Sequence, residues 1–313
     1  MRVTDSFRIR TVINNLNSSR ERLNRIQEDL ANGKRIHRPS DDPLSAANSL
    51  RIKTTLEGNA QFEKNIDDSI AYLTAAEAAL DNLSEILMQV KEIVTEGASD
   101  SIVDRKHLAT QLELILKNMV EVGNAKFNGK YIFGGTKTIT PPFTLNENEL
   151  RFDTGEDIVN YRGNNDYFKR QINENTVISL NITGSEVFQK SGSSGVDLFQ
   201  LLKDLIDKFK QEDLTGERVS GSEISPYIDV VNRGIDQVLE SYLKIGTRKQ
   251  LVIFNRDRFQ TQDIQLKANL SKLEDTDFGE AFVQFKAEEN ALNAALSAGA
   301  RVISPSLLDF LGI

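Results

Sequence analysis

The sequence predicts a mainly α-helical protein with a small β insert: a nested, antiparallel bundle of long helices of the coiled-coil kind, with a distal β domain. Three observations favour this fold class. Alanine, the best helix former, is absent between Ala125 and Ala268 but frequent on both sides of that gap. Apolar residues recur at alternating steps of three and four, which is typical of helices that pack lengthwise. Helix-start signals also divide the chain into segments of matched length.

Two long helices are predicted over 43–97 and 222–275, and their near-equal lengths suit an antiparallel pair. Each carries an apolar seam, meaning a row of residues at those steps of three and four. The first seam contains Ile66, Ser69, Leu73, Ala76, Leu80, Leu83, Leu87, Val90 and Val94. The second contains Ile224, Ile228, Val231, Ile235, Val238, Tyr242 and Ile245. A shorter helix is predicted from the spacing of Leu108, Leu112, Ile115, Met119 and Val122. Helical spacing of apolar residues returns from position 197.

The two chain ends carry the same signal over 6–32 and 278–303. Their near-equal lengths predict that these terminal helices pair with each other, in a long rod with both chain ends together. The large apolar residues of the two seams are Val12, Leu16, Leu23, Ile26 and Leu30, and Phe278, Phe282, Phe285, Leu292 and Leu296. An isolated helical hairpin of this size is marginal in water, so we expect the terminal pair to need neighbouring subunits to become ordered.

Capping residues set the predicted boundaries. Asp42 before Pro43, and Ser225 before Pro226, each offer an N-cap followed by proline at the first helical position. Asp277 has the spacing of a capping box with Glu280. Gly33 is suited to end the first helix.

Short runs rich in β-branched and aromatic residues, separated by turn signals, predict an outer β-rich domain over 137–190. The remaining chain then forms two discontinuous domains. Residues 1–40 with 276–313 form a terminal coiled-coil assembly domain, and 41–136 with 191–275 form a long-helix core bundle.

The composition excludes several kinds of site. The 313 residues include no cysteine and two histidines, so disulfides, thiolate metal sites and cysteine nucleophiles are ruled out. A net charge of −8 argues against a bulk nucleic-acid binder. No run approaches the roughly 20 apolar residues of a membrane span. No cleavable secretory signal is visible, so we expect any export to use another route.

No residue set carries catalytic chemistry. The basic cluster Lys34-Arg35-Ile36-His37-Arg38 could contact phosphate or nucleic acid. A solvated connector between two helices, balanced by Asp41 and Asp42, explains it better in an acidic chain. His107 has no partner at ligand spacing. We therefore predict no catalytic residue, no cofactor-binding residue, no metal site and no enzyme activity.

Several segments resemble the flagellin superfamily. The stretch from Leu30 to Pro43, with the sequence LANGKRIHRPSDDP, is similar to the connector between the first two helices of that family. The stretch from Asn65 to Val94 resembles its first long core helix. Ile245-Gly-Thr-Arg248 and Glu274-Asp-Thr-Asp-Phe278 resemble its C-terminal core and the entry to its last helix. Arg38-Pro-Ser-Asp-Asp-Pro43 and the ending Ser306-Leu-Leu-Asp-Phe-Leu311 favour the branch that joins hook to filament.

The resemblance implies a structural adaptor of the bacterial flagellum at the hook–filament junction. Such chains are secreted unfolded by type III export and assemble by packing of terminal and core helices. The implied partners are further copies in a flagellar ring, hook-associated protein 1, flagellin and a cytoplasmic export chaperone, with no nucleic acid and no membrane. By analogy, the ten terminal-seam residues named above are subunit-interface residues, and Arg38, Asp41 and Asp42 are connector contacts. Two alternatives stay open: a filament flagellin, and a cytoplasmic coiled-coil interaction protein.

Overall fold

The computed structural model describes residues 2–99, 105–146, 158–190, 195–215 and 219–310. The predicted fold class is confirmed: long helices pack antiparallel, accompanied by small antiparallel strand pairs. The long helices are α1 (Arg2–Asn32), α2 (Pro43–Gly97), α7 (Gly221–Glu274) and α8 (Phe278–Phe310).

The contacts divide the chain into two compact units. The first contains Met1–Asn59 and Thr261–Ile313, and the second contains Ala60–Gln260. Helices α2 and α7 contribute residues to both units, because neither is interrupted at the division. The three-domain division at 40/41, 136/137, 190/191 and 275/276 stays a prediction.

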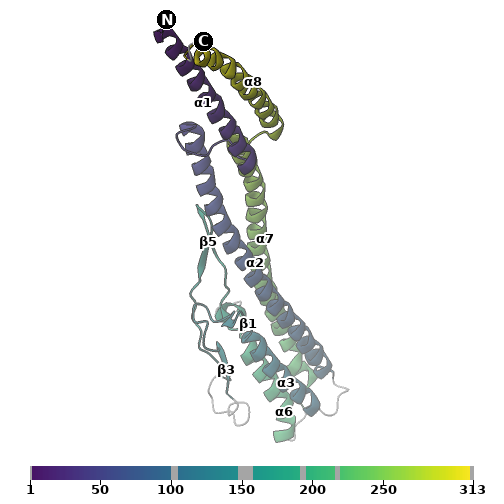
Figure 1. Cartoon of the computed structure of the whole chain (residues 1–313). Coiled ribbons are helices and arrows are strands. Elements are labelled where there is room, and N and C mark those ends of the chain that lie inside the picture. The colour runs from purple at the N-terminus through teal and green to yellow at the C-terminus, as the bar shows by residue number, and fades with distance from the viewer. Residues whose placement is uncertain (1, 100–104, 147–157, 191–194, 216–218, 311–313) are drawn as a thin grey trace. The chain divides into compact units, whose positions relative to one another are not determined.

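In the first unit, α1 and α8 lie side by side (Figure 1). The start of α2 and the end of α7 run antiparallel, and a buried amide–carboxylate hydrogen bond joins them. Asn59 Nδ2 donates to Asp263 Oδ1 at 2.7 Å, and both side chains are buried. Burial of these polar groups is tolerated because each satisfies the other.

In the second unit, the predicted seam of α2 forms the core. All nine of its residues, from Ile66 to Val94, are buried. Helices α3 (Lys106–Gly123) and α6 (Leu198–Thr215) pack against each other and close this core (Figure 1). The seam of α7 alternates between buried and half-buried residues, with Ile224, Val231, Val238 and Ile245 fully enclosed.

The strands form three separate two-stranded antiparallel sheets. They are β1 (Lys126–Phe127) with β2 (Lys130–Tyr131), β3 (Phe143–Leu145) with β4 (Val159–Tyr161), and β5 (Lys169–Asn173) with β6 (Thr176–Ser179). The β1–β2 hairpin lies before 137–190, the range that was predicted to contain the strands. Its tight turn is made by Asn128 and Gly129, both of which have positive φ. The short helix α5 (Gly184–Val187) follows the last strand. A cluster of packed rings, with centroids 4.9–5.4 Å apart, holds β3 against α6 through Phe143, Phe188 and Phe199.

Three of the four helix boundaries predicted from capping residues agree with the structure. Asp42 Oδ1 accepts the Ser45 N–H at 3.1 Å where α2 begins, and Asp277 Oδ1 accepts the Glu280 N–H at 3.1 Å where α8 begins. Gly33, with φ +67°, ends α1. The start predicted at Ser225-Pro226 is wrong. Helix α7 begins at Gly221, so Pro226 lies inside it, and the Ser225 hydroxyl donates to the Gly221 carbonyl at 2.9 Å.

Candidate assembly surface

The predicted seam of α1 faces α8. Val12, Leu16, Leu23, Ile26 and Leu30 are all half-buried, while their neighbours along the helix are mostly exposed. A Cβ built on Gly299 of α8 would lie 3.1 Å from the Val12 side chain, so the absence of a side chain at Gly299 lets the two helices approach closely. Farther along the α1–α8 pair, Arg22 Nε of α1 donates to Glu288 Oε1 of α8 at 2.8 Å.

The predicted seam of α8 divides into two groups. Phe285 and Leu292 are half-buried. Phe278, Phe282 and Leu296 remain 58%, 56% and 52% exposed. The face toward α1 is completed instead by small residues, with Ala281 and Gly299 buried. The three exposed side chains are therefore free within this chain for contacts with another chain, and their place in a subunit interface stays a prediction.

The predicted connector contacts are local. Asp42 caps α2, and the hydrogen bond from Ser45 lowers the pKa of its carboxyl. Asp41 Oδ2 accepts the Arg38 backbone N–H at 2.9 Å, and the Asp41 N–H donates to the Arg38 carbonyl at 3.0 Å. These bonds fix the turn that leads into α2, and the Arg38 side chain is left exposed.

A buried carboxylate at the end of α7 organises this region. Glu274 is 6% exposed, and its carboxylate accepts hydrogen bonds from Ser49 and Lys53 of α2 and from Lys34 of the connector. The distance from Lys34 Nζ to Glu274 Oε2 is 3.0 Å. Burial opposes ionisation, but the hydrogen bonds from Lys53, Ser49 and Lys34 outweigh it and lower the pKa of Glu274 to about 2. Glu274 lies within a segment that carried the family resemblance, but nothing in the sequence distinguishes it as a buried acid.

The basic cluster 34–38 is part of the same arrangement. The Arg35 N–H donates to the Glu274 carbonyl at 2.7 Å, and Arg35 Nη2 donates to the Leu273 carbonyl at 3.2 Å. The imidazole Nε2 of His37 lies 2.7 Å from Asp29 Oδ1. The cluster lies between α1 and α2, and the acids that its side chains contact are Glu274 and Asp29 rather than the expected Asp41 and Asp42. Glu274 could not be anticipated as a partner because it is 240 positions from Lys34.

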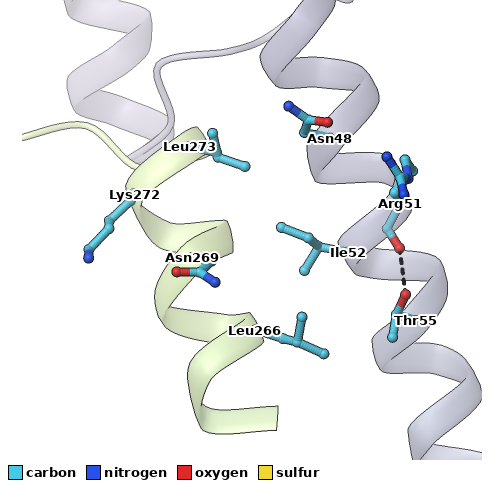
Figure 2. A pocket seen from close by; sticks show the side chains of 8 residues that line it. All are labelled: Asn48, Arg51, Ile52, Thr55, Leu266, Asn269, Lys272 and Leu273. Carbon is cyan, nitrogen blue, oxygen red and sulfur yellow. Dashed lines mark hydrogen bonds between the residues drawn. The ribbon is translucent and has the colours of Figure 1, made fainter. Parts of the chain in front are cut away.

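A groove of about 570 Å³ opens between α2 and α7 in the first unit (Figure 2). Its apolar lining is Ile52 of α2 with Leu266 and Leu273 of α7, and Figure 2 shows Ile52 and Leu266 pointing toward each other. Both charged residues that line it, Arg51 and Lys272, are cations. Sequence reasoning did not identify this groove, because it depends on how two distant helix segments are aligned.

Among the described residues, no group of three or more His, Asp or Glu side chains could hold a metal ion. Within those same ranges, no helix is long and apolar enough to cross a membrane. His107 lies 3.8 Å from Glu96, and both side chains are about half exposed.

Together, the paired terminal helices, the capped connector and the long core helices define a helical protein built from pairs of long antiparallel helices. The family described as the bacterial flagellin N-terminal helical region matches residues 10–138. The predicted resemblance to the flagellin superfamily is thereby confirmed. More particularly, the chain is similar to flagellar hook-associated protein 3 of Salmonella typhimurium, with 23% identity over 94% of this chain and 95% of that relative.

Two further matches extend this comparison. Flagellin of Bacillus subtilis is also 23% identical, over 95% of this chain and 94% of its own length. A solved structure described as a flagellar hook-associated protein of Vibrio parahaemolyticus has a TM-score of 0.64 and 22% identity, and it covers 75% of this chain and all of that one. The structural match supports the fold, while the two sequence matches include both a hook-associated protein and a flagellin.

Proposed function

We propose that this chain is a structural adaptor of the bacterial flagellum that joins the hook to the filament. The observation that carries the proposal is its similarity to flagellar hook-associated protein 3 along almost the full length of both chains. The connector sequence Arg38-Pro-Ser-Asp-Asp-Pro43 and the ending Ser306-Leu-Leu-Asp-Phe-Leu311 support the same assignment. The chain would be secreted and would act at the hook–filament junction, without catalysis or a cofactor.

The assembly surface supports a mechanism based on packing. Exposed Phe278, Phe282 and Leu296 on α8 offer apolar area that this chain does not bury by itself, and burial of such area drives association. The chain would be exported unfolded by the type III route, held beforehand by a cytoplasmic chaperone. It would then assemble as a ring of copies between hook-associated protein 1 and flagellin.

A filament flagellin is the second candidate. The observation that favours it is the match to Bacillus subtilis flagellin, which has the same identity and nearly the same coverage as the match to hook-associated protein 3. The fold is common to both roles, so the position of the chain in the flagellum must distinguish them. A cytoplasmic coiled-coil interaction protein is less well supported, because the similarity to hook-associated protein 3 spans 94% of this chain.

Deletion of the gene tests these roles. Loss of a junction adaptor should leave completed hooks without filaments, and flagellin should be released into the medium. Loss of a filament flagellin should remove flagellin itself, and loss of a cytoplasmic protein should leave the flagellum intact. Restoring the gene should restore filaments in the first case. Hooks that carry normal filaments in the deletion strain would contradict the proposed function.

A further inference from the structure

The tight turn of the β1–β2 hairpin consists of an asparagine followed by a glycine, Asn128 and Gly129. Asparagine is a thermolabile residue, because the backbone nitrogen of the next residue can attack its side-chain carbonyl carbon. Glycine hinders this nitrogen least, since it has no Cβ. The tripeptide Asn-Gly-Lys occurs twice in the chain, from Asn32 and from Asn128. The two copies show how different surroundings act on the same local sequence.

At the hairpin, the attacking nitrogen is available. Within the described ranges, neither the Gly129 N–H nor the side-chain amide of Asn128 has a hydrogen-bond partner. Both residues are exposed, and a Cβ built on Gly129 would meet no atom within 4 Å. Nothing in the described part of the chain therefore holds the two reacting groups apart or keeps water from them.

The turn must open before the nitrogen can attack, because Asn128 is in the left-handed conformation with φ +49°. Opening requires little free energy here. The two strands have two residue pairs, Lys126 with Tyr131 and Phe127 with Lys130, and a hairpin of this size is marginally stable. Most residues of 126–131 are exposed, so opening the tip exposes little apolar area.

The second copy of the tripeptide is held in place. Asn32 is the last residue of α1, and the Gly33 N–H donates to the Asp29 carbonyl at 2.8 Å. The Gly33 carbonyl accepts the Thr276 N–H at 3.0 Å. The attacking nitrogen is thus occupied, and the bond to Thr276 fixes Gly33 independently of the α1 seam.

We propose that Asn128 is a site of spontaneous deamidation and that Asn32 is protected from the same reaction. The Gly129 nitrogen forms a bond to Asn128 Cγ and gives up its proton, the Cγ–Nδ2 bond breaks, and the amide nitrogen leaves as ammonia. Water then opens the succinimide ring, at one carbonyl to give aspartate and at the other to give isoaspartate. One water is consumed and one ammonia is released. The reaction goes beyond the proposed function and does not depend on it.

Isoaspartate disrupts the hairpin in which it forms. It adds one carbon atom to the backbone of the turn, so a two-residue turn no longer fits the pairing of Phe127 with Lys130. The ring of Phe127 packs edge-on against Tyr72 of α2, with centroids 5.9 Å apart. Both rings line a cavity of about 520 Å³ that Asn128 also borders. Deamidation therefore changes the charge and the packing at the edge of this cavity.

Incubation of the purified full-length chain in heavy-oxygen water tests the proposal. Proteolysis and mass spectrometry then follow the peptides that contain Asn32 and Asn128, since each conversion replaces an amide by a carboxyl that carries one heavy oxygen. We expect conversion at Asn128 to be about tenfold faster than at Asn32, or more, with isoaspartate among the products. In the denatured chain, the two identical tripeptides should react within about twofold of each other, because the folded surroundings are lost.

Freshly prepared Asn128→Asp is the matched variant, because it carries the new charge on an unaltered backbone. The Tyr131 N–H donates to the Thr138 carbonyl and the Ile132 N–H to the Ala125 carbonyl. Exchange of these two amide hydrogens should quicken in the aged chain and stay slow in Asn128→Asp. Equal conversion of Asn32 and Asn128 in the folded chain would overturn the proposal. An intact Asn128 in a folded chain whose denatured form reacts would overturn it as well.

Discussion

Lys34 and Glu274 lie 240 positions apart in the sequence, yet the ammonium of Lys34 donates to Glu274 Oε2 at 3.0 Å. The pair joins the connector after α1 to the last residue of α7. Glu274 also accepts from Ser49 and Lys53, and its backbone carbonyl accepts from Arg35. One buried carboxylate thus fixes both the start of α2 and the path of the chain between the first two helices.

Glu274→Gln should destabilise the first unit. The amide retains the shape of the side chain but not its charge, and it leaves the ammonium groups of Lys34 and Lys53 without a carboxylate partner. We expect a loss of about 1–3 kcal/mol in the free energy of unfolding, seen as faster amide hydrogen exchange at the end of α7 and the start of α2. Glu57→Gln, at an exposed position of α2, is the control and should change little. Equal exchange in the two variants would refute the role given to Glu274.

The same carboxylate makes the first unit sensitive to acid. The folded pKa of Glu274, about 2, is below the ordinary value of 4.5, so its contribution to stability is present above pH 4.5 and is lost as the pH falls toward 2. The contribution is at most about 3 kcal/mol. Unfolding followed between pH 6 and 2.5 should show a steeper loss in the unmodified chain than in Glu274→Gln. Parallel curves would contradict this prediction.

Glu240 provides a useful comparison for that titration. Lys190 and Lys244 lower its pKa to about 2 as well, through hydrogen bonds, but its side chain is half exposed. Solvent screens such a pair and reduces its contribution to stability. Glu240→Gln should therefore flatten the pH dependence much less than Glu274→Gln does, although the two carboxyls have similar pKa values.

The sequence predicts the helices far better than the polar contacts between them. The range 43–97 coincides with α2, and 222–275 differs from α7 by one residue at each end, because regular apolar seams act locally, although the cap signal at Ser225-Pro226 did not mark the start of α7. Glu274 and Arg105 could not be identified in this way. Arg105 is 1% exposed and donates to the carbonyls of Gly97, eight positions away, and Val219, 114 positions away, so its burial depends on a distant segment. Periodicity also did not identify Ala281, which lies outside the predicted seam of α8 but is buried.

Two glycine-to-alanine substitutions should act in opposite directions. A Cβ at Gly246, inside α7, meets no atom within 4 Å, so Gly246→Ala should stabilise the helix by about 0.5–1 kcal/mol. A Cβ at Gly97, the last residue of α2, would lie 2.5 Å from the buried ring of Phe209, so Gly97→Ala should destabilise by about 1–3 kcal/mol. Chemical denaturation of both variants measures the difference. A destabilised Gly246→Ala would show that this position is covered by something the single chain lacks.

The terminal helix pair should be the least protected part of the isolated chain. The seam of α1 is only half-buried, and four large apolar side chains in the described part of α8 stay exposed, whereas the seam of α2 in the second unit is fully enclosed. Segments with few buried apolar contacts open at low free energy. Hydrogen exchange of the isolated protein should be fast over 6–32 and 278–303 and slow over 66–94. Strong protection of both termini would contradict the prediction that neighbouring subunits are needed to order them.

Leu23→Asp tests the α1 seam most directly. Leu23 is half-buried on the face toward α8, so a charged carboxylate there would lose apolar burial and would have to be desolvated. We expect the variant to be secreted but not to assemble, with the second unit, Ala60–Gln260, still folded as judged by unchanged hydrogen exchange over 66–94. Asn24→Asp introduces the same carboxylate one residue away on the exposed face and should assemble normally. Normal filaments on cells that carry only Leu23→Asp would refute assembly through this seam.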